Sequence, residues 1–371
     1  MHSTMLGKTI PEPSPADTPA VLGRRYQSAG AREVLLTATQ LAVRDAILRD
    51  DRKEDWEEAR CLCGDTAGLL LSEIDRHGLP YNKRLCAACG LLRVSPRWNV
   101  SRYARFYQEE YRDLYKPVEG TKEEFVEAAA ANAGVRSIAS WVTEGARRFQ
   151  AGASPTIVEI GAGGGWNLAN LPPSWSRIGF DVDSDYLAAG RSKANIDLRH
   201  GFLDEAISTG CVRAANIVLL SHVVEHFIDP IEQLDRLRRA MSPDALLMIE
   251  VPGVFSIHRG RYDPMRMMQN AHIHTFCADT LAAACVRAGY RVLEVDETVR
   301  AVCRPDGAGQ GPAPKRSPGG RELSRRIFGY LRSCERGVSV MQRLRQIPLV
   351  GRLGAALFRR IWFPFVGIVY R

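Results

Sequence analysis

TIVEIGAGGG, residues 156 to 165, joins a β-prone apolar run that ends in an acid to a glycine-rich turn. Gly161 and Gly163 let the backbone turn tightly and approach a ligand without a Cβ in the way. The helix expected after the turn begins with unpaired NH groups. The stretch therefore predicts a strand, a ligand-binding turn and a helix.

The spacing of these glycines argues against two common nucleotide sites. A dinucleotide-binding turn needs a third glycine three residues after the second, and that position is Trp166. A phosphate-binding P-loop needs Gly-Lys-Ser or Gly-Lys-Thr, which does not follow. On this segment alone, an ordinary strand-to-helix turn without a ligand remains an alternative.

The next segments alternate between strand and helix patterns. Residues 176 to 183 read as a second strand, with Asp181 placed where an acid accepts hydrogen bonds from ribose hydroxyls. Residues 216 to 222 read as a buried strand, 231 to 241 as a helix and 246 to 251 as another strand. This alternation is typical of a parallel α/β sheet.

Taken in order, residues 151 to 303 resemble the class I S-adenosylmethionine-dependent methyltransferases. The resemblance rests on E-x-G-x-G-x-G at 159 to 165, the acid at 181, SHVVEHFIDP at 221 to 230, VPG at 251 to 253 and His-x-His-x-Phe at 272 to 276. The last two motifs are similar to the small-molecule branch of that family. The resemblance implies a Rossmann-like, mostly parallel sheet of seven strands and S-adenosyl-L-methionine as the cofactor.

The resemblance also implies which residues hold the cofactor. The glycines would line its methionine end with Glu159 supporting the loop, Asp181 would hold the ribose, and residues 202, 203 and 221 would flank the adenine and the sulfonium side. The implied cofactor-binding residues are Glu159, Gly161, Ala162, Gly163, Gly165, Asp181, Val182, Phe202, Leu203 and Ser221. Asp204 either reaches the adenine amine or caps a helix.

Four of the nine cysteines form two pairs, Cys61-Leu62-Cys63-Gly64 and Cys86-Ala87-Ala88-Cys89-Gly90. The pairs resemble zinc knuckles, in which four thiolates surround one structural Zn²⁺ and the glycine permits a turn that aims NH groups at sulfur. The first pair is one residue shorter than the usual C-x-x-C, so four small buried residues remain an alternative. A zinc module before a class I core resembles the layout of some sugar and natural-product methyltransferases.

Composition and patterning, together with the two resemblances, divide the chain into six segments. We expect a disordered, proline-bearing leader at 1–30, a helix plus the zinc-binding module at 31–96, a helical connector or acceptor cap at 97–150, the methyltransferase core at 151–303, a linker rich in Gly and Pro at 304–320 and a basic amphipathic helical tail at 321–371. In the first helix, Val34, Ala38, Leu41 and Leu48 would share the apolar side. Aromatic residues at 103, 107, 111 and 115 form a stripe that suits a core or an interdomain face better than acceptor contact.

Length, composition and charge narrow the functional class. The chain has 371 residues, 45% of them hydrophobic, as in a folded globular protein. Residues 301 to 371 carry 14 Lys plus Arg against 3 Asp plus Glu, or +11, so residues 1 to 300 carry 8 − 11 = −3. The core is therefore not a basic nucleic-acid surface. The absence of a long apolar run and the odd number of cysteines favour the reducing cytoplasm.

The tail has three interpretations. Residues 347 to 370 mix large apolar side chains with Arg352, Arg359 and Arg360. We favour a helix that packs its apolar face on the methyltransferase. Peripheral contact of 347–371 with the inner membrane surface comes next, and RNA binding last.

Histidines near the expected sheet edge are the candidate general bases, because imidazole titrates near neutral pH. His272 and His226 are the first choices; His222 also belongs to the catalytic candidates, with Glu225 and His274 as further possibilities. A helix beginning at His222 would place it on one face with His226. The same run matches the H-x-x-E-H zinc site of inverted metalloproteases, but its place at a strand end in a nucleotide-binding order argues against that reading.

The predicted function is S-adenosylmethionine-dependent methyl transfer to a small hydroxylated acceptor such as a saccharide, a nucleotide-sugar or a secondary metabolite, with oxygen favoured over carbon. The alternative is an RNA methyltransferase that clamps nucleic acid with the zinc module and the basic tail. Against it, no Asn-Pro-Pro-Tyr or Asp-Pro-Pro-Tyr follows the strand ending at Leu220. A noncatalytic scaffold is the third class, although the glycine turn and Asp181 are intact.

Overall fold

The computed structural model describes residues 22–28, 36–50, 52–115, 138–191, 196–259, 263–306, 319–347 and 351–370. The chain forms two compact units. The cysteine unit consists of residues 1–103, 255–271 and 317–371, and the sheet unit of residues 104–254 and 272–316. We had expected residues 255–271 to belong to the methyltransferase core at 151–303, but they form part of the cysteine unit.

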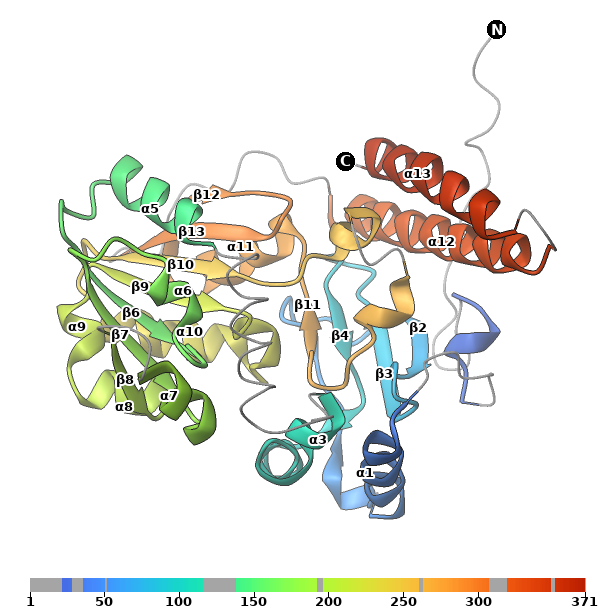
Figure 1. The fold of residues 1–371 in the computed structure, drawn as a ribbon, viewed down its shortest axis with the longest axis horizontal. Coiled ribbons are helices and arrows are strands. Elements are labelled where there is room, and N and C mark those ends of the chain that lie inside the picture. Colours follow the sequence, from blue (N-terminus) through green and yellow to red (C-terminus); the bar gives the residue numbers. More distant parts are fainter. Residues whose placement is uncertain are drawn as a thin grey trace, which may run out of the picture. The chain divides into compact units, whose positions relative to one another are not determined.

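The sheet unit is built on seven strands (Figure 1). They are β6 (Thr156–Ile160), β7 (Ser176–Asp181), β8 (Asp197–His200), β9 (Ile217–Ser221), β10 (Leu246–Glu250), β12 (Tyr290–Val295) and β13 (Arg300–Pro305), in the order β12-β13-β10-β9-β6-β7-β8. Only β13 runs antiparallel to its neighbours. The predicted mostly parallel, seven-stranded α/β sheet is confirmed.

The helices of the sheet unit alternate with the strands. They are η3 (Phe106–Glu110), α3 (Tyr111–Tyr115), α5 (Ala139–Arg148), α6 (Trp166–Ala169), α7 (Ser184–Arg191), α8 (Leu203–Ser208), α9 (Cys211–Ala214), η4 (Val224–His226), α10 (Pro230–Ala240) and α11 (Ala278–Arg287), and a short strand, β11 (His274–Thr275), precedes α11. The start of α10 is encoded locally: Asp229 Oδ1 accepts hydrogen bonds from the NH groups of Ile231 and Glu232, and Pro230 occupies the first helical position.

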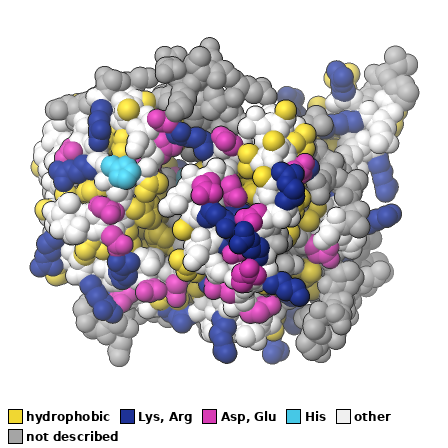
Figure 2. Space-filling view, turned by 90° about the horizontal axis from the view of Figure 1, so that it is seen from below, with side chains coloured by type: hydrophobic (Ala, Val, Ile, Leu, Met, Phe, Trp, Pro, Cys, Tyr) yellow, Lys and Arg dark blue, Asp and Glu magenta, His cyan; other side chains and the backbone are white. Residues whose placement is uncertain are grey.

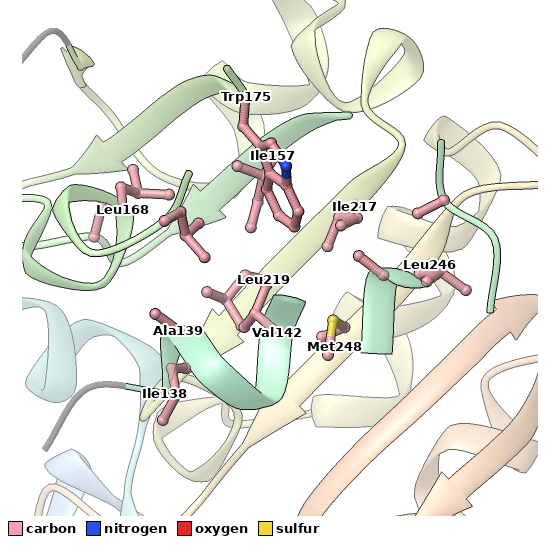
Figure 3. Close-up of a cluster of buried hydrophobic side chains, with 14 of the residues drawn as sticks. Ile138, Ala139, Val142, Ile157, Leu168, Trp175, Ile217, Leu219, Leu246 and Met248 are labelled. Carbon is pink, nitrogen blue, oxygen red and sulfur yellow. The ribbon is translucent and has the colours of Figure 1, made fainter. Parts of the chain in front are cut away.

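The core of the sheet unit lies between the central strands and the helices. Figure 3 shows Val142 of α5 facing Leu219 of β9 and Met248 of β10. Gly145 permits this close approach, since a Cβ there would lie 2.7 Å from Met248 Cε. Strands buried on both faces explain why their sequences are continuously apolar.

The cysteine unit contains small antiparallel sheets and helices. β2 (Leu69–Ile74), β3 (Pro80–Leu85) and β4 (Leu92–Val94) pair in that order, and β1 (Trp56–Glu57) pairs with β5 (Arg97–Trp98). The helices are η1 (Arg24–Tyr26), α1 (Ala38–Arg49), η2 (Lys53–Asp55), η6 (Pro264–Met267), α12 (Gly320–Arg345) and α13 (Gly351–Val369). Two elements lie where the units meet in sequence: α2 (Val100–Arg105) and η5 (Val254–Arg259).

The first helix forms where expected but turns a different side inward. α1 begins with a capping box in which Thr37 and Gln40 exchange hydrogen bonds. Ile47 is its buried residue, whereas Leu41 and Leu48 are exposed. Val34 lies outside the described residues. Four scattered apolar positions identified the helix without determining its packed face, because tertiary contacts make that choice.

Residues 22–28, expected in a disordered leader, hold a defined structure. Tyr26 is fully buried, and its hydroxyl donates a hydrogen bond to Glu335 at 2.6 Å. The Arg25 guanidinium bonds both Glu335 and Asp263. Because two distant segments satisfy this buried arginine, this part of the leader is bound to the cysteine unit. Residues 1–21 and the greater part of the expected linker, 307–318, lie outside the described residues.

The tail forms two helices that lie side by side, coloured red in Figure 1. α12 packs against the second cysteine turn: a Cβ on Gly90 would lie 2.9 Å from Leu323 Cγ, and one on Gly320 would lie 1.7 Å from the Ala88 carbonyl oxygen. The apolar face of α12 is therefore buried in the cysteine unit. The helix expected within 347–370 forms as α13, which packs on α12 of the same unit. No helix in the described part of the chain is long and apolar enough to cross a membrane.

Candidate active site and metal centre

The glycine loop, residues 161–165, forms a tight turn after β6. The NH groups of Gly161 and Ala162 both donate to the Phe180 carbonyl, at 2.8 and 3.0 Å. Gly161, Gly163 and Gly165 have φ values of 77°, 56° and 71°, a region that residues with a Cβ rarely adopt. A Cβ on Gly161 would also lie 2.6 Å from Val223 Cγ2. Both the backbone conformation and the available space thus require glycine at 161.

Glu159 lies beneath this loop and is 1% exposed. Asn167 donates a hydrogen bond to its Oε1 at 2.7 Å, whereas Oε2 is buried and has no hydrogen-bond partner in the structure. Burial raises the pKa of the Glu159 carboxyl to about 8. An orphaned buried oxygen of this kind is suited to a cationic ligand group.

Asp181 ends β7 and supports the glycine loop directly. Its Oδ2 accepts a hydrogen bond from the Gly163 NH at 2.7 Å, and its Oδ1 accepts one from the Asp183 NH at 2.8 Å. Asp181 thus connects the glycine loop to the turn after β7. The neighbouring Val182 is 62% exposed.

Phe202 is close to the glycine loop, with a ring carbon 3.9 Å from the position of a Cβ on Gly161. Leu203 is buried, and the Ser221 hydroxyl at the end of β9 donates to Glu250 Oε2 at 3.1 Å. Phe202 thus lies beside the loop, while Leu203 begins α8 after β8 and Ser221 ends β9.

Asp204 does not cap a helix, the second of its two expected roles. Its carboxylate is exposed and forms an ion pair with Arg236. The capping contact at the start of α8 comes instead from Glu205, whose Oε2 accepts a hydrogen bond from the Phe202 NH at 2.8 Å.

The strand order explains why these residues assemble. The chain passes from β6 to β7 on one side and returns to β9 on the other, so the connections diverge between β6 and β9. In such sheets, ligands bind outside the carboxyl ends of the strands at this divergence. The glycine loop, Asp181 and Ser221 all lie at those carboxyl ends.

A second group of side chains follows β9; we call Glu225, His226 and His272 the histidine cluster. Their possible ligand atoms all lie within 4.8 Å of one another. The two imidazole rings meet edge to face with centroids 4.9 Å apart, and His226 Nε2 lies 3.9 Å from Glu225 Oε1. Glu225 is 1% exposed, and neither of its oxygens has a hydrogen-bond partner in the structure.

Tyr107 extends this cluster and was not among the candidates from sequence. Its hydroxyl lies 2.9 Å from His226 Nδ1. The π-helix η3 shifts the register of the aromatic stripe, so Tyr107 contacts His226 while Tyr111 and Tyr115 stack on each other at 5.1 Å. π-Helical turns are frequent at functional sites. The aromatic stripe was the available signal, but its spacing could not show which ring would meet a histidine.

Arg112 of α3 was also missed. It forms a two-bond ion pair with Asp183, at 2.7 and 2.8 Å, and a second pair with Asp185. It thereby connects the aromatic segment to the residues that follow Asp181. The sequence could not predict the role of Arg112, because both of its partners lie 71 to 73 residues away along the chain.

His222 and His274 are placed differently from His226. His222 has a φ of 56° and η4 begins only at Val224, so the expected shared helix face of His222 and His226 does not form. The His222 NH donates to the Glu250 carbonyl at 2.8 Å, and its Nδ1 lies 3.3 Å from Glu225 Oε1. His274 is buried.

The four paired cysteines come together in the cysteine unit, and we call them the cysteine cluster. Their sulfurs lie within 4.8 Å of one another, with Cys61 to Cys89 at 3.5 Å and Cys63 to Cys86 at 3.7 Å. A tetrahedral zinc site with Zn–S bonds of about 2.3 Å has sulfur separations of about 3.8 Å. The arrangement fits one four-coordinate Zn²⁺ and leaves no ligand position for a substrate.

The backbone around the cysteine cluster also suits thiolates. The Ala88 and Cys89 NH groups donate to the Cys86 sulfur, and the Cys63 NH donates to the Cys61 sulfur. Hydrogen bonds, chiefly from the Cys61 thiol, lower the pKa of Cys86 to about 2. Gly64 and Gly90 have φ values of 94° and 78°, as the predicted turns require. The short spacing of the first pair therefore does not prevent its two sulfurs from converging with the second pair.

Comparison with known proteins identifies the family. Residues 103–295, just over half of the chain, match the family model described as a methyltransferase domain. No curated protein matches the chain. The similar solved structures include human N-acetylserotonin methyltransferase in complex with SAM, at 16% identity and a TM-score of 0.38, covering 56% of this chain and 62% of that one.

Two bacterial structures are further examples. An S-adenosylmethionine-dependent methyltransferase from Mesorhizobium loti is 14% identical, covers 41% of this chain and 91% of its own, and has a TM-score of 0.32. One from Clostridium acetobutylicum is 7% identical, covers 56% and 99%, and has a TM-score of 0.36. With the family match and the sheet described above, the chain belongs to the methyltransferase-domain family and is an S-adenosylmethionine-dependent methyltransferase of the class I fold.

Proposed function

We propose that this chain transfers the methyl group of S-adenosyl-L-methionine to a hydroxyl of a small acceptor, such as a saccharide, a nucleotide-linked sugar or a secondary metabolite. The observation that carries the proposal is the histidine cluster, which follows β9 in the same unit as the glycine loop. It supplies a base for an acceptor hydroxyl near the place where the family binds its cofactor.

The residues around the glycine loop fit this cofactor. Its ribose hydroxyls would be bound by Asp181, its methionine end would lie along Gly161 and Gly163, and the orphaned Oε2 of Glu159 suits a neighbouring positive charge. The cofactor, when bound, supplies an electrophilic methyl group on a sulfonium. Transfer is an in-line displacement, so the protein must chiefly orient the acceptor and exclude water.

His226 is the base that the geometry favours. In the tautomer in which its Nδ1–H donates to the Tyr107 hydroxyl oxygen at 2.9 Å, Nε2 carries the lone pair that accepts the proton of the acceptor hydroxyl. The acceptor O–H bond breaks, its oxygen forms a bond to the methyl carbon, the methyl–sulfur bond breaks, and the proton remains on His226. The buried Glu225 carboxylate, 3.9 Å from Nε2, stabilises the resulting imidazolium. His272 is the second candidate, and its ring would complete the wall beside His226.

The acceptor is proposed to lie along the aromatic segment. Tyr107 is 38% exposed, and the Tyr111–Tyr115 stack follows it on the next turns. A sugar or an aromatic ring can pack on such a surface. Oxygen is favoured over carbon because one near-neutral base is sufficient to deprotonate a hydroxyl as it attacks.

Charge argues for a small acceptor over nucleic acid. Residues 1 to 300 carry a net charge of −3. On the face shown in Figure 2, basic and acidic side chains are interspersed, and no broad basic surface forms there. Proteins that bind nucleic acid usually present a concentrated basic patch.

Methyl transfer from labelled S-adenosyl-L-methionine to a panel of nucleotide-sugars and free glycosides would test the proposal. His226→Asn should lower kcat by about 10²- to 10⁴-fold, the usual contribution of a general base, with the cofactor Kd by calorimetry unchanged. Asp181→Ala should do the opposite and weaken cofactor binding. Transfer to RNA alone, or full kcat in the His226 variant, would overturn the assignment, and NMR of the product would locate the methyl on oxygen or carbon.

We further propose that the cysteine cluster binds a structural Zn²⁺. Metal analysis of protein purified without chelator should give one zinc per chain. A protein that keeps its fold with no metal bound would contradict this assignment, because four converging thiols with hydrogen-bonded sulfurs serve a metal.

A further inference from the structure

Helix α13 carries an exposed apolar stripe formed by Leu353, Leu357, Ile361, Phe365 and Ile368. These residues recur at intervals of four, four, four and three, so they lie along one face of the helix. Their side chains are between 56% and 77% exposed. Val369 is also exposed, so α13 holds six of the thirteen large hydrophobic residues that are exposed in the described part of the chain.

The stripe is not the face that α13 packs on α12. Phe363 and Val366 are buried, and the Trp362 indole NH donates to the Ser333 carbonyl of α12 at 3.0 Å. A Cβ on Gly337 of α12 would lie 2.5 Å from the Trp362 ring, which shows how closely the two helices meet. At the end of α13, the Tyr370 carbonyl accepts a hydrogen bond from Arg326 at 2.6 Å. The helix is therefore apolar on two faces, and among the described residues only the face towards α12 is covered.

Charge indicates what covers the other face. No acidic residue occurs in 351–371, whereas Arg352, Arg359, Arg360 and Arg371 do. Residues 301–371 as a whole carry +11. A second copy of α13 would bring the same positive charge against the stripe, with no carboxylate on the helix to pair with it. An anionic surface with an apolar interior is complementary to both features.

We propose that α13 binds an anionic lipid surface, lying in its plane with the stripe inserted at the boundary of headgroups and acyl chains and with arginines on the lipid phosphates. The mostly aliphatic stripe distinguishes a bilayer from RNA, which would need aromatic side chains for base stacking. α12 then connects the bound helix to the cysteine unit, whose second turn it contacts at Gly90. This inference does not depend on the acceptor proposed above.

Vesicle sedimentation with the full-length, metal-bound protein tests this proposal. We expect binding to vesicles of phosphatidylcholine mixed with phosphatidylglycerol, and at least about tenfold weaker binding to phosphatidylcholine alone. Ile361→Asp with Leu357→Asp should reduce binding to the anionic vesicles by about tenfold or more, because charged side chains replace apolar ones at the acyl boundary. Arg352→Gln with Arg360→Gln should reduce it by several-fold and remove part of its salt dependence.

Val100→Asp is the matched control, since Val100 is 64% exposed but lies outside the stripe; this variant should bind vesicles like the original protein. Thermal unfolding and zinc content, measured for each variant, show that the fold is kept. Absence of binding to anionic vesicles overturns the proposal. So does equal binding to neutral vesicles, or a dimer in light scattering that the two stripe substitutions separate while vesicles have no effect.

Discussion

The glycine loop of the sheet unit and the turns of the cysteine cluster use the same backbone device for different ends. In both, a glycine with positive φ turns the chain beside the functional residues. Gly161 is also crowded, with Val223 in the way of any Cβ, whereas a Cβ on Gly64 would meet nothing within 4 Å. Gly90 of the second cysteine turn is crowded as well, by Leu323 of α12 at 2.9 Å, so of these three glycines only Gly64 is required by its backbone conformation alone.

The two regions also shift the pKa of an ionisable side chain in opposite directions. Burial raises the pKa of Glu159 to about 8, whereas hydrogen bonds, first from Cys61, lower the pKa of Cys86 to about 2. The first group is protonated at neutral pH and the second is prepared for a cation.

The largest expected effect is removal of a cysteine ligand. Cys86→Ser should abolish stoichiometric zinc and unfold the cysteine unit, because structural zinc supplies about 10 kcal/mol or more in small zinc domains. Cys334→Ala, also buried in this unit but outside the cluster, is the control and should keep its zinc. Metal analysis and limited proteolysis measure both. A folded, protease-resistant Cys86 variant would show that the cluster is not a metal site.

Gly161→Ala should weaken cofactor binding by about tenfold or more. A Cβ at this positive φ strains the backbone by about 1–3 kcal/mol, and it would also clash with Val223. Gly152→Ala is its matched partner, since Gly152 also has a positive φ, 104°, but open space around it. Calorimetry with S-adenosylhomocysteine should separate the two variants, and equal affinities would mean that the approach to Val223 has no role.

Glu159 predicts a pH dependence of stability. Its folded pKa of about 8 lies above the unfolded value, so the folded state binds the extra proton and the penalty on stability grows as pH rises from about 4.5 to 8. Glu159→Gln removes that penalty. At about pH 9 its Tm without ligand should exceed that of the original protein by at least about 3 °C, since one pKa unit is worth about 1.4 kcal/mol.

Near pH 5 the two proteins should melt within about 1 °C of each other, because Glu159 is then protonated in the folded state and resembles glutamine. A Tm gap that is the same at both pH values would show that the carboxyl is ionised throughout.

The smallest effect concerns the two glycines of the cysteine turns. Gly64→Ala should cost about 1–2 kcal/mol from its positive φ alone. Gly90→Ala should cost more, because its Cβ would also press on Leu323 of α12 at 2.9 Å. Zinc-dependent unfolding monitored by circular dichroism ranks the two variants. A larger loss of stability for Gly64→Ala than for Gly90→Ala would show that the contact between α12 and the second cysteine turn does not stabilise the cysteine unit.

Local sequence was sufficient for much of the fold. The apolar runs at 156–160 and 217–221 predicted strands because buried parallel strands are continuously hydrophobic. The helix expected at 231–241 appears at 230–240, since Asp229 and Pro230 define its start. The prediction of which side of α1 is buried was wrong, and so was the prediction that residues 22–28 are disordered. Both features depend on partners far along the chain.

The candidate active site was less accessible. His226 and His272 could be nominated by chemistry, but their contact joins residues 46 positions apart in the chain. The hydrogen bond between Tyr107 and His226 spans 119 positions, and Tyr107 lies in a π-helical turn that periodicity does not reveal. Neither the connection through Arg112 nor the position of Asp204 could be obtained from spacing.

The sequence by itself determined the glycine loop, the order of strands and helices and the two cysteine pairs, because backbone freedom, hydrophobic periodicity and ligand spacing act over a few residues. Only the tertiary structure decided that Glu225, His226 and His272 meet, that four sulfurs converge and that α13 leaves one apolar face exposed. Those features arise from packing between distant segments, where the burial of one face and the exposure of another are chosen by the partners available.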